Sequence, residues 1–118
     1  MRDEINSTPI SNQESLIINI DHSSNDGTHW TCLSTENNMC VYFDSFGLPP
    51  PTEVVTYCNA LALTSSSNKP LLRLFNTFPL QKPHEVICGH LCIFLLYRLS
   101  NGDDFPTVLD TLYNYRNN

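Results

Sequence analysis

Four side chains of this sequence carry groups that together can perform acyl transfer: Cys88, His29, Asp44 and Gln81. A thiolate can attack a carbonyl carbon, and an imidazole can accept the thiol proton. A carboxylate can fix the tautomer and orientation of that imidazole, while a carboxamide can donate to the oxyanion that develops. His29 and Asp44 lie far from Gln81 and Cys88 in the sequence, so the fold must bring the four positions together.

Cys88 is placed at the predicted start of a helix, where unpaired backbone amides carry partial positive charge that favours an ionised thiol. Its own amide can point toward a developing oxyanion, and Gly89 allows another segment to approach closely. Taken alone, Cys88 also fits the role of a small buried core residue, because free cysteines are often buried.

His29 and Asp44 are predicted at neighbouring ends of two antiparallel strands. His29 opens the first strand, where its imidazole can face a cleft while the Trp30 indole shields one side from water. Asp44 closes the second strand and can accept a hydrogen bond from that imidazole. Each residue also fits a structural role, as a satisfied histidine or as a turn aspartate that bonds its local backbone.

Gln81 precedes Cys88 by seven residues, in a segment that Pro79 and Pro83 make irregular. Its carboxamide can donate to the oxyanion beside the amide of Cys88. Taken alone, Gln81 is an ordinary loop residue.

A metal site is an alternative, because His84, Cys88, His90 and Cys92 fall within nine residues. We disfavour it, since the two cysteines share a helix face without the Cys-x-x-Cys hairpin that usually seeds zinc binding. We therefore predict no metal and no cofactor. The remaining cysteines are interpreted as reduced thiols that pack in the core: Cys32, Cys40, Cys58 and Cys92.

The apolar pattern and its flanking turn and cap residues predict the elements that must position these groups. A β-branched first strand is expected to be buried, and the polar residues 35–38 suit a hairpin turn between the second and third strands. The predicted strands are 16–20, 29–34, 39–43 and 71–75, and the predicted helices are 52–63, 88–99 and a last one from Asp103-Asp104 to about Tyr115.

The helix 88–99 is apolar on nearly every side, including at Ile93, and is therefore expected at the centre of the domain. Arg98 in its last turn and Asn101-Gly102 just beyond are typical of a helix end.

Length and composition favour one compact domain, predicted at residues 15–118 after a flexible lead-in at residues 1–14. A net charge of −6 offers no basic surface to neutralise phosphates, so we expect no autonomous nucleic-acid binding. The longest apolar stretch, 86–97, is about 12 residues long, whereas a membrane helix needs about 20. With no secretory signal recognised, we expect an intracellular protein, in the nucleus or cytoplasm, and no membrane partner.

The motifs at 27–30 and 42–47, with Gln81 and the pair Cys88-Gly89, resemble the adenovirus-type protease family, adenain. The informative feature is the order histidine, acid, glutamine, cysteine, over about residues 15–99. The same order is found in the proteases that process SUMO and other ubiquitin-like proteins, and adenain-like proteases occur in viral-type DNA transposons. The motif at 42–47 and the glutamine-to-cysteine spacing look closest to the adenain and transposon branch.

The resemblance implies an α+β cysteine-proteinase fold, with a central buried helix that carries the nucleophile packed on a mixed, mostly antiparallel sheet. It implies a cysteine endopeptidase with Cys88 as nucleophile, His29 as base, Asp44 as orienting acid and Gln81 as oxyanion donor. The implied partner is a protein or peptide substrate, from a viral or transposon polyprotein or a ubiquitin-like protein. The resemblance also allows a peptide activator and association with a virion.

Two features depart from the family. Asp44 stands where the adenoviral enzymes have glutamate, although the SUMO-type relatives use aspartate, so the role survives. Only 28 residues precede His29, so we expect a domain shortened at its N-terminal side, with part of the substrate cleft absent. A shortened, catalytically inactive protease-like binding module is therefore the alternative function.

Overall fold

The computed structural model describes residues 13–20, 29–36, 39–64, 71–81 and 87–116. Most of the predicted lead-in, the motif residues Gly27 and Thr28, half of the predicted hairpin turn and His84 lie outside the described residues.

The described residues form three helices and a four-stranded sheet, close to the elements that the sequence pattern predicts. The elements in chain order are β1 (Gln13–Asn19), β2 (Trp30–Glu36), β3 (Met39–Phe43), α1 (Thr52–Thr64), β4 (Leu72–Phe75), α2 (Cys88–Ser100) and α3 (Phe105–Arg116).

The strand order is β1-β2-β3-β4, with antiparallel pairs β1–β2 and β2–β3 and a parallel pair β3–β4. The sheet is thus mixed and mostly antiparallel, and the predicted antiparallel pairing of the second and third strands is confirmed. β1 begins at Gln13, two residues before the predicted boundary at Ser15, because Gln13 and Glu14 continue the ladder opposite Glu36 and Thr35.

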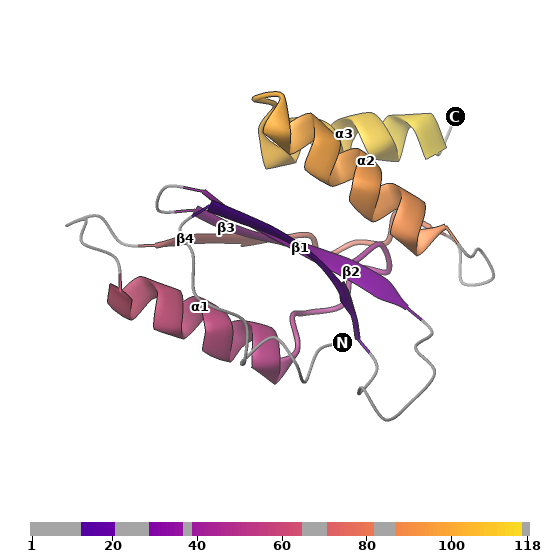
Figure 1. Ribbon diagram of the computed structural model, residues 1–118. Coiled ribbons are helices and arrows are strands. Elements are labelled where there is room, and N and C mark those ends of the chain that lie inside the picture. Colours follow the sequence, from indigo (N-terminus) through magenta and orange to yellow (C-terminus); the bar gives the residue numbers. More distant parts are fainter. Residues whose placement is uncertain (1–12, 21–28, 37–38, 65–70, 82–86, 117–118) are drawn as a thin grey trace.

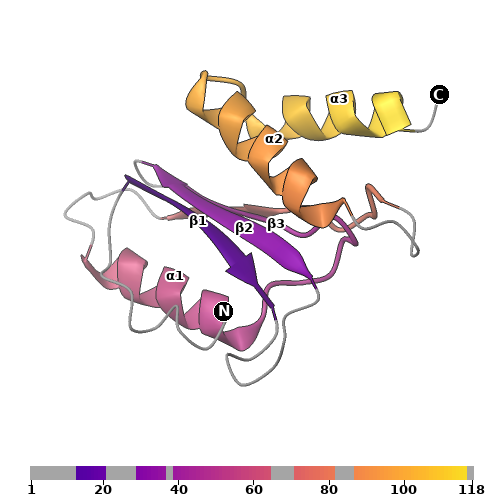
Figure 2. The same cartoon turned by 45° about the vertical axis from the view of Figure 1, so that its right-hand side comes forward.

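Side chains of β2 and β3 alternate between two apolar clusters on opposite faces of the sheet, as the pleat of a strand requires. Cys32, Val41 and Phe43 pack toward α2 and α3, whereas Leu33 and Tyr42 pack toward α1. Figure 1 shows the resulting three layers, with α1 on one side of the sheet and α2 and α3 on the other. The turned view in Figure 2 shows the same arrangement, with α2 crossing over the sheet.

Two burial predictions need correction. The sequence predicts that β1 is a buried strand, but it is an edge strand and Ile17 is 46% exposed, so only one of its faces packs in the core. α2 buries Cys88, Leu91, Cys92 and Leu95, but Ile93 is 58% exposed because it lies on the face away from the sheet cluster.

The ends of the last two helices follow the predicted signals. Gly102 adopts a left-handed backbone, with φ of 95°, just after the end of α2. Asp104 caps α3 by accepting from the Thr107 amide at 2.9 Å, and the hydrogen bonds from Thr107 lower the pKa of this carboxyl below its usual value. Among the described residues, no helix combines the length and the hydropathy needed to cross a bilayer.

Candidate active site

The candidate site forms at one edge of the sheet, where three strand ends coincide. β2 begins where β3 ends because the two strands are antiparallel, which makes His29 and Asp44 neighbours. β3 and β4 are parallel, so both continue into loops at this same edge. These loops carry Asp44 and Gln81, while the start of α2 supplies Cys88.

His29 and Asp44 form a buried hydrogen bond, with 2.8 Å between imidazole Nε2 and carboxylate Oδ1. The residues are 6% and 1% exposed, so little water competes for this contact. The same Oδ1 also accepts from the backbone amide of Phe46 at 2.8 Å. The carboxylate therefore has two donors, which offset part of the cost of burying its charge.

The Phe46 ring fixes the imidazole from another side. Its centroid lies 4.6 Å from that of the His29 ring, with 31° between the ring planes. The last pair of the β2–β3 ladder is Cys32 with Phe43, and Phe46 lies in the turn that follows β3. The ladder itself stops at Phe43, and the turn at residues 44–47 places the Phe46 ring against the imidazole.

The hydrogen bond to Asp44 decides the proton arrangement of the neutral imidazole. An ionised carboxylate only accepts hydrogen bonds, so Nε2 carries the proton and Nδ1 presents its lone pair. The imidazole can therefore accept a second proton only at Nδ1, the atom on the side of the ring away from this hydrogen bond.

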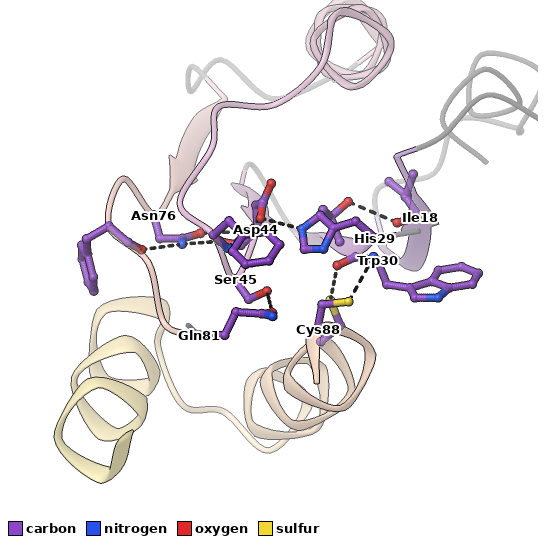
Figure 3. A network of polar contacts seen from close by, with 12 residues as sticks. Ile18, His29, Trp30, Asp44, Ser45, Asn76, Gln81 and Cys88 are labelled. Atoms are coloured by element: carbon purple, nitrogen blue, oxygen red, sulfur yellow. Dashed lines mark hydrogen bonds and ion pairs between the residues drawn. The ribbon is translucent and has the colours of Figure 1, made fainter. Parts of the chain in front are cut away.

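Cys88 is the first residue of α2, and its sulfur accepts a hydrogen bond from the backbone amide of Trp30 at 3.4 Å. Because Trp30 follows His29 directly, this contact holds the thiol beside the segment that carries the imidazole. Figure 3 shows the Cys88 side chain pointing from the helix start toward that segment. The N-cap residue Ile87 has no side-chain acceptor, so the first amides of α2 receive no cap from it.

Trp30 connects the strand to the helix through its backbone and its ring. The Cys92 thiol, one helical turn after Cys88, donates to the Trp30 carbonyl at 3.6 Å. A Cβ at Gly89 would lie 3.8 Å from the indole, which is ordinary contact. The described surroundings of Gly89 therefore do not need glycine, contrary to the expected close approach. The indole itself is 44% exposed beside the thiol.

Gln81 is buried and its side-chain Oε1 accepts from the Ser45 hydroxyl. A backbone hydrogen bond of 2.7 Å, from the Leu80 amide to the Ser45 carbonyl, joins the same two loops. Because Oε1 faces Ser45, the Nε2 group of Gln81 is directed away from it. The loop that carries the acid thus determines the orientation of the predicted oxyanion donor.

Asn76 was not predicted as a site residue, although its side chain belongs to this network. Its carboxamide bonds both the amide and the carbonyl of Asp44, at 3.2 and 2.6 Å. One indication of its role is present in the sequence: Asn76 directly follows a predicted strand, as Asp44 does. Only the parallel pairing of β3 and β4 shows that these two positions lie side by side.

The other four cysteines are buried free thiols, as predicted for core packing. Burial, with a hydrogen bond to Cys92, raises the pKa of the Cys32 thiol well above its ordinary value. A hydrogen bond to Cys58, with burial, likewise raises the pKa of Cys40. Within the described part of the chain, no three metal-ligating side chains are grouped to hold an ion, and His84 falls outside that part.

Comparison with solved structures identifies a protease fold. The crystal structure of the ASFV pS273R protease, solved with selenomethionine, superposes with a TM-score of 0.66 at 17% sequence identity. The alignment covers 89% of this chain and 43% of that protease, so the chain spans less than half of its length. No protein-family profile matches the sequence, and no curated protein matches it.

The predicted fold class is confirmed: the chain is α+β, with helices packed on a mixed sheet in the arrangement of a viral protease structure. The likeness concerns the fold. Membership of the adenain family and the roles of Cys88, His29, Asp44 and Gln81 stay predictions.

Gly47, in the loop that follows β3, lies close to the backbone of the loop that follows β4. Its backbone is left-handed, with φ of 76°, and a Cβ there would lie 2.6 Å from the Phe78 carbonyl carbon. Real Cβ atoms do not come so close to backbone atoms. Glycine is therefore required here for both its conformation and its lack of a side chain.

We predict that Gly47→Ala lowers the free energy of unfolding by more than about 2 kcal/mol, because left-handed strain and a backbone clash add. Gly102→Ala is the matched control, since Gly102 is also left-handed, with φ of 95°, but has nothing within 4 Å of its Cβ position. It should cost only about 1 kcal/mol. Urea unfolding of both variants measures the difference, and equal losses would contradict the close approach.

Proposed function

We propose that the chain is a cysteine peptidase domain in which His29 activates Cys88, Asp44 orients His29, and Gln81 with the Cys88 amide stabilises the oxyanion. The observation that carries the proposal is the buried 2.8 Å contact between His29 Nε2 and Asp44 Oδ1. It is supported by the sulfur of Cys88, which accepts from the amide of the next residue, Trp30, at 3.4 Å.

In the first step, the Nδ1 lone pair of His29 accepts the thiol proton of Cys88. The imidazolium that forms is stabilised by Asp44, whose carboxylate already accepts from Nε2. The Trp30 amide and the start of α2 provide N–H groups near the sulfur, where negative charge develops. The result is an ion pair between the Cys88 thiolate and the His29 imidazolium. Both residues are shielded from water, because Cys88 is 7% exposed and His29 is 6% exposed.

In the second step, the thiolate attacks a peptide carbonyl and its oxygen becomes an oxyanion. The Cys88 amide and the Nε2 group of Gln81 donate to that oxygen. His29 then gives its proton to the leaving amine, and water hydrolyses the acyl-enzyme to release the second product and restore the thiol.

The substrate class of the proposal follows the resemblance to adenain and the SUMO-type proteases. We propose that it is a viral or transposon polyprotein or a ubiquitin-like protein, cut near a small residue such as glycine. The fold shared with the ASFV pS273R protease supports a peptidase over an unrelated thiol enzyme.

The direct test is labelling with a peptide that ends in a thiol-reactive electrophile. We expect one adduct per chain, and peptide mass spectrometry should assign it to Cys88, because this thiol is held at the backbone of the residue that follows His29. Cys88→Ala should abolish the adduct. Cys92→Ala is the matched control one helical turn away, and it should keep the adduct because Cys92 is fully buried.

An adduct that persists in Cys88→Ala would contradict the proposed nucleophile. A folded chain that gives no adduct and no cleavage, yet binds a protein partner, would favour the alternative of a protease-like binding module.

A second prediction concerns the acid. Asp44→Asn keeps the shape but removes the charge that stabilises the imidazolium, so kcat/KM should fall roughly 10²- to 10⁴-fold. Asp110→Asn makes the same chemical change at an exposed position on α3 and should leave kcat/KM within about 2-fold. Cleavage of a fluorogenic peptide measures kcat/KM of both variants. An unchanged kcat/KM in Asp44→Asn would exclude the orienting role.

A further inference from the structure

Asn76 is a fully enclosed polar residue that joins the two loops of the candidate site. It is 2% exposed and directly follows β4. Its Oδ1 accepts from the Asp44 amide at 3.2 Å, and its Nδ2 donates to the Asp44 carbonyl at 2.6 Å. Nδ2 also donates to the Phe78 carbonyl at 3.2 Å.

The first two bonds replace backbone pairing that the strands no longer make. The β3–β4 ladder ends at the pair Tyr42 and Phe75. A carboxamide carries a donor and an acceptor in the same relation as a peptide group, so the Asn76 side chain can satisfy both backbone groups of Asp44. Since Asp44 is 1% exposed, these groups would otherwise be buried with fewer partners.

The third bond reaches the loop that leads to Gln81. Phe78 lies in the sequence between Asn76, which donates to its carbonyl, and Leu80, whose amide donates to the Ser45 carbonyl. The Asn76 side chain therefore bonds the backbone of Asp44. It also bonds the backbone of Phe78, in the segment that leads to Gln81. Figure 3 shows Asn76 next to Asp44, on the side of the acid away from His29.

We propose that Asn76 is a positioning residue that sets Asp44 against His29 and keeps the Asp44 loop in register with the Gln81 loop. This inference rests on the proposed peptidase function. Asn76 contacts no reacting atom, and it acts through Asp44 and through the loop of residues 76–81.

The chemistry explains why asparagine stands at this position. Aspartate has the same shape and can still accept from the Asp44 amide, but its ionised carboxylate cannot donate to the carbonyls of Asp44 and Phe78. Alanine loses all three bonds. Asn76→Asp and Asn76→Ala therefore remove the positioning contacts to different extents.

The test compares both variants with Val108→Ala, a core substitution on α3 at a fully buried site. All three destabilise the fold, but only the Asn76 variants disturb the Asp44 loop. We expect kcat/KM to fall roughly 10- to 100-fold in both Asn76 variants, as for a small misplacement of a reacting group, and by less than about 3-fold in Val108→Ala. Activity is measured well below the melting temperature of each variant.

A second readout does not depend on catalysis. The His29 ring N–H that donates to Asp44 is buried, so wild type should show a low-field proton resonance by NMR that exchanges slowly with water. We expect Val108→Ala to keep this resonance and Asn76→Ala to lose it. Retained resonance together with unchanged kcat/KM in both Asn76 variants would overturn the positioning role.

The two readouts separate the inference from the function on which it rests. If wild type is inactive but shows the resonance, and Asn76→Ala loses it, the peptidase proposal fails while the positioning of Asp44 stands. If neither Asn76 variant folds, hydrogen exchange of wild type decides, because the Asp44 amide bonded to Asn76 must be strongly protected. Fast exchange of that amide would overturn the inference.

Discussion

The buried hydrogen bond between His29 and Asp44 is the contact on which the candidate site depends. A carboxylate that is 1% exposed needs donors close by. The Phe46 amide is a local donor, whereas the His29 imidazole is available only because β2 begins beside the end of β3. The antiparallel register fixes this condition, and a slip of one residue would turn the side chains of a strand to the opposite face. The turn that follows β3 brings Phe46 onto the imidazole, so Asp44 and Phe46 together hold the position and the orientation of His29.

The parallel pair β3–β4 adds a second constraint, because it sends two loops out of the same edge of the sheet. Asn76, Ser45 and Gly47 join these loops through a carboxamide, a hydroxyl and a close backbone approach. The positions of Asp44 and Gln81 are therefore linked by contacts between the two loops. In the proposed acyl transfer, these contacts keep the base that Asp44 orients and the oxyanion donor Gln81 directed at the same substrate carbonyl.

Local patterns predicted most of this structure, and nonlocal pairing explains what they missed. β2 and β3 follow one another in the sequence and pair antiparallel, so the proximity of His29 to Asp44 could be predicted from the sequence. The pairing of β3 with β4 spans α1, and without it the carboxamide of Asn76 had no assigned partner. The apolar side chains of Ile17 and Ile93 gave the same signal as core residues, because a pattern of hydrophobicity cannot distinguish an edge strand or an outer helix face from a buried one.

The most direct measurement is a crystal structure of the chain with a peptide aldehyde bound as a hemithioacetal, which imitates the tetrahedral intermediate. The account predicts a covalent bond from Cys88 Sγ, hydrogen-bonding distance from His29 Nδ1 to the bound intermediate, and an oxyanion in contact with Gln81. An aldehyde attached to another thiol, or an imidazole that still bonds Asp44 but faces away from the bound sulfur, would contradict it.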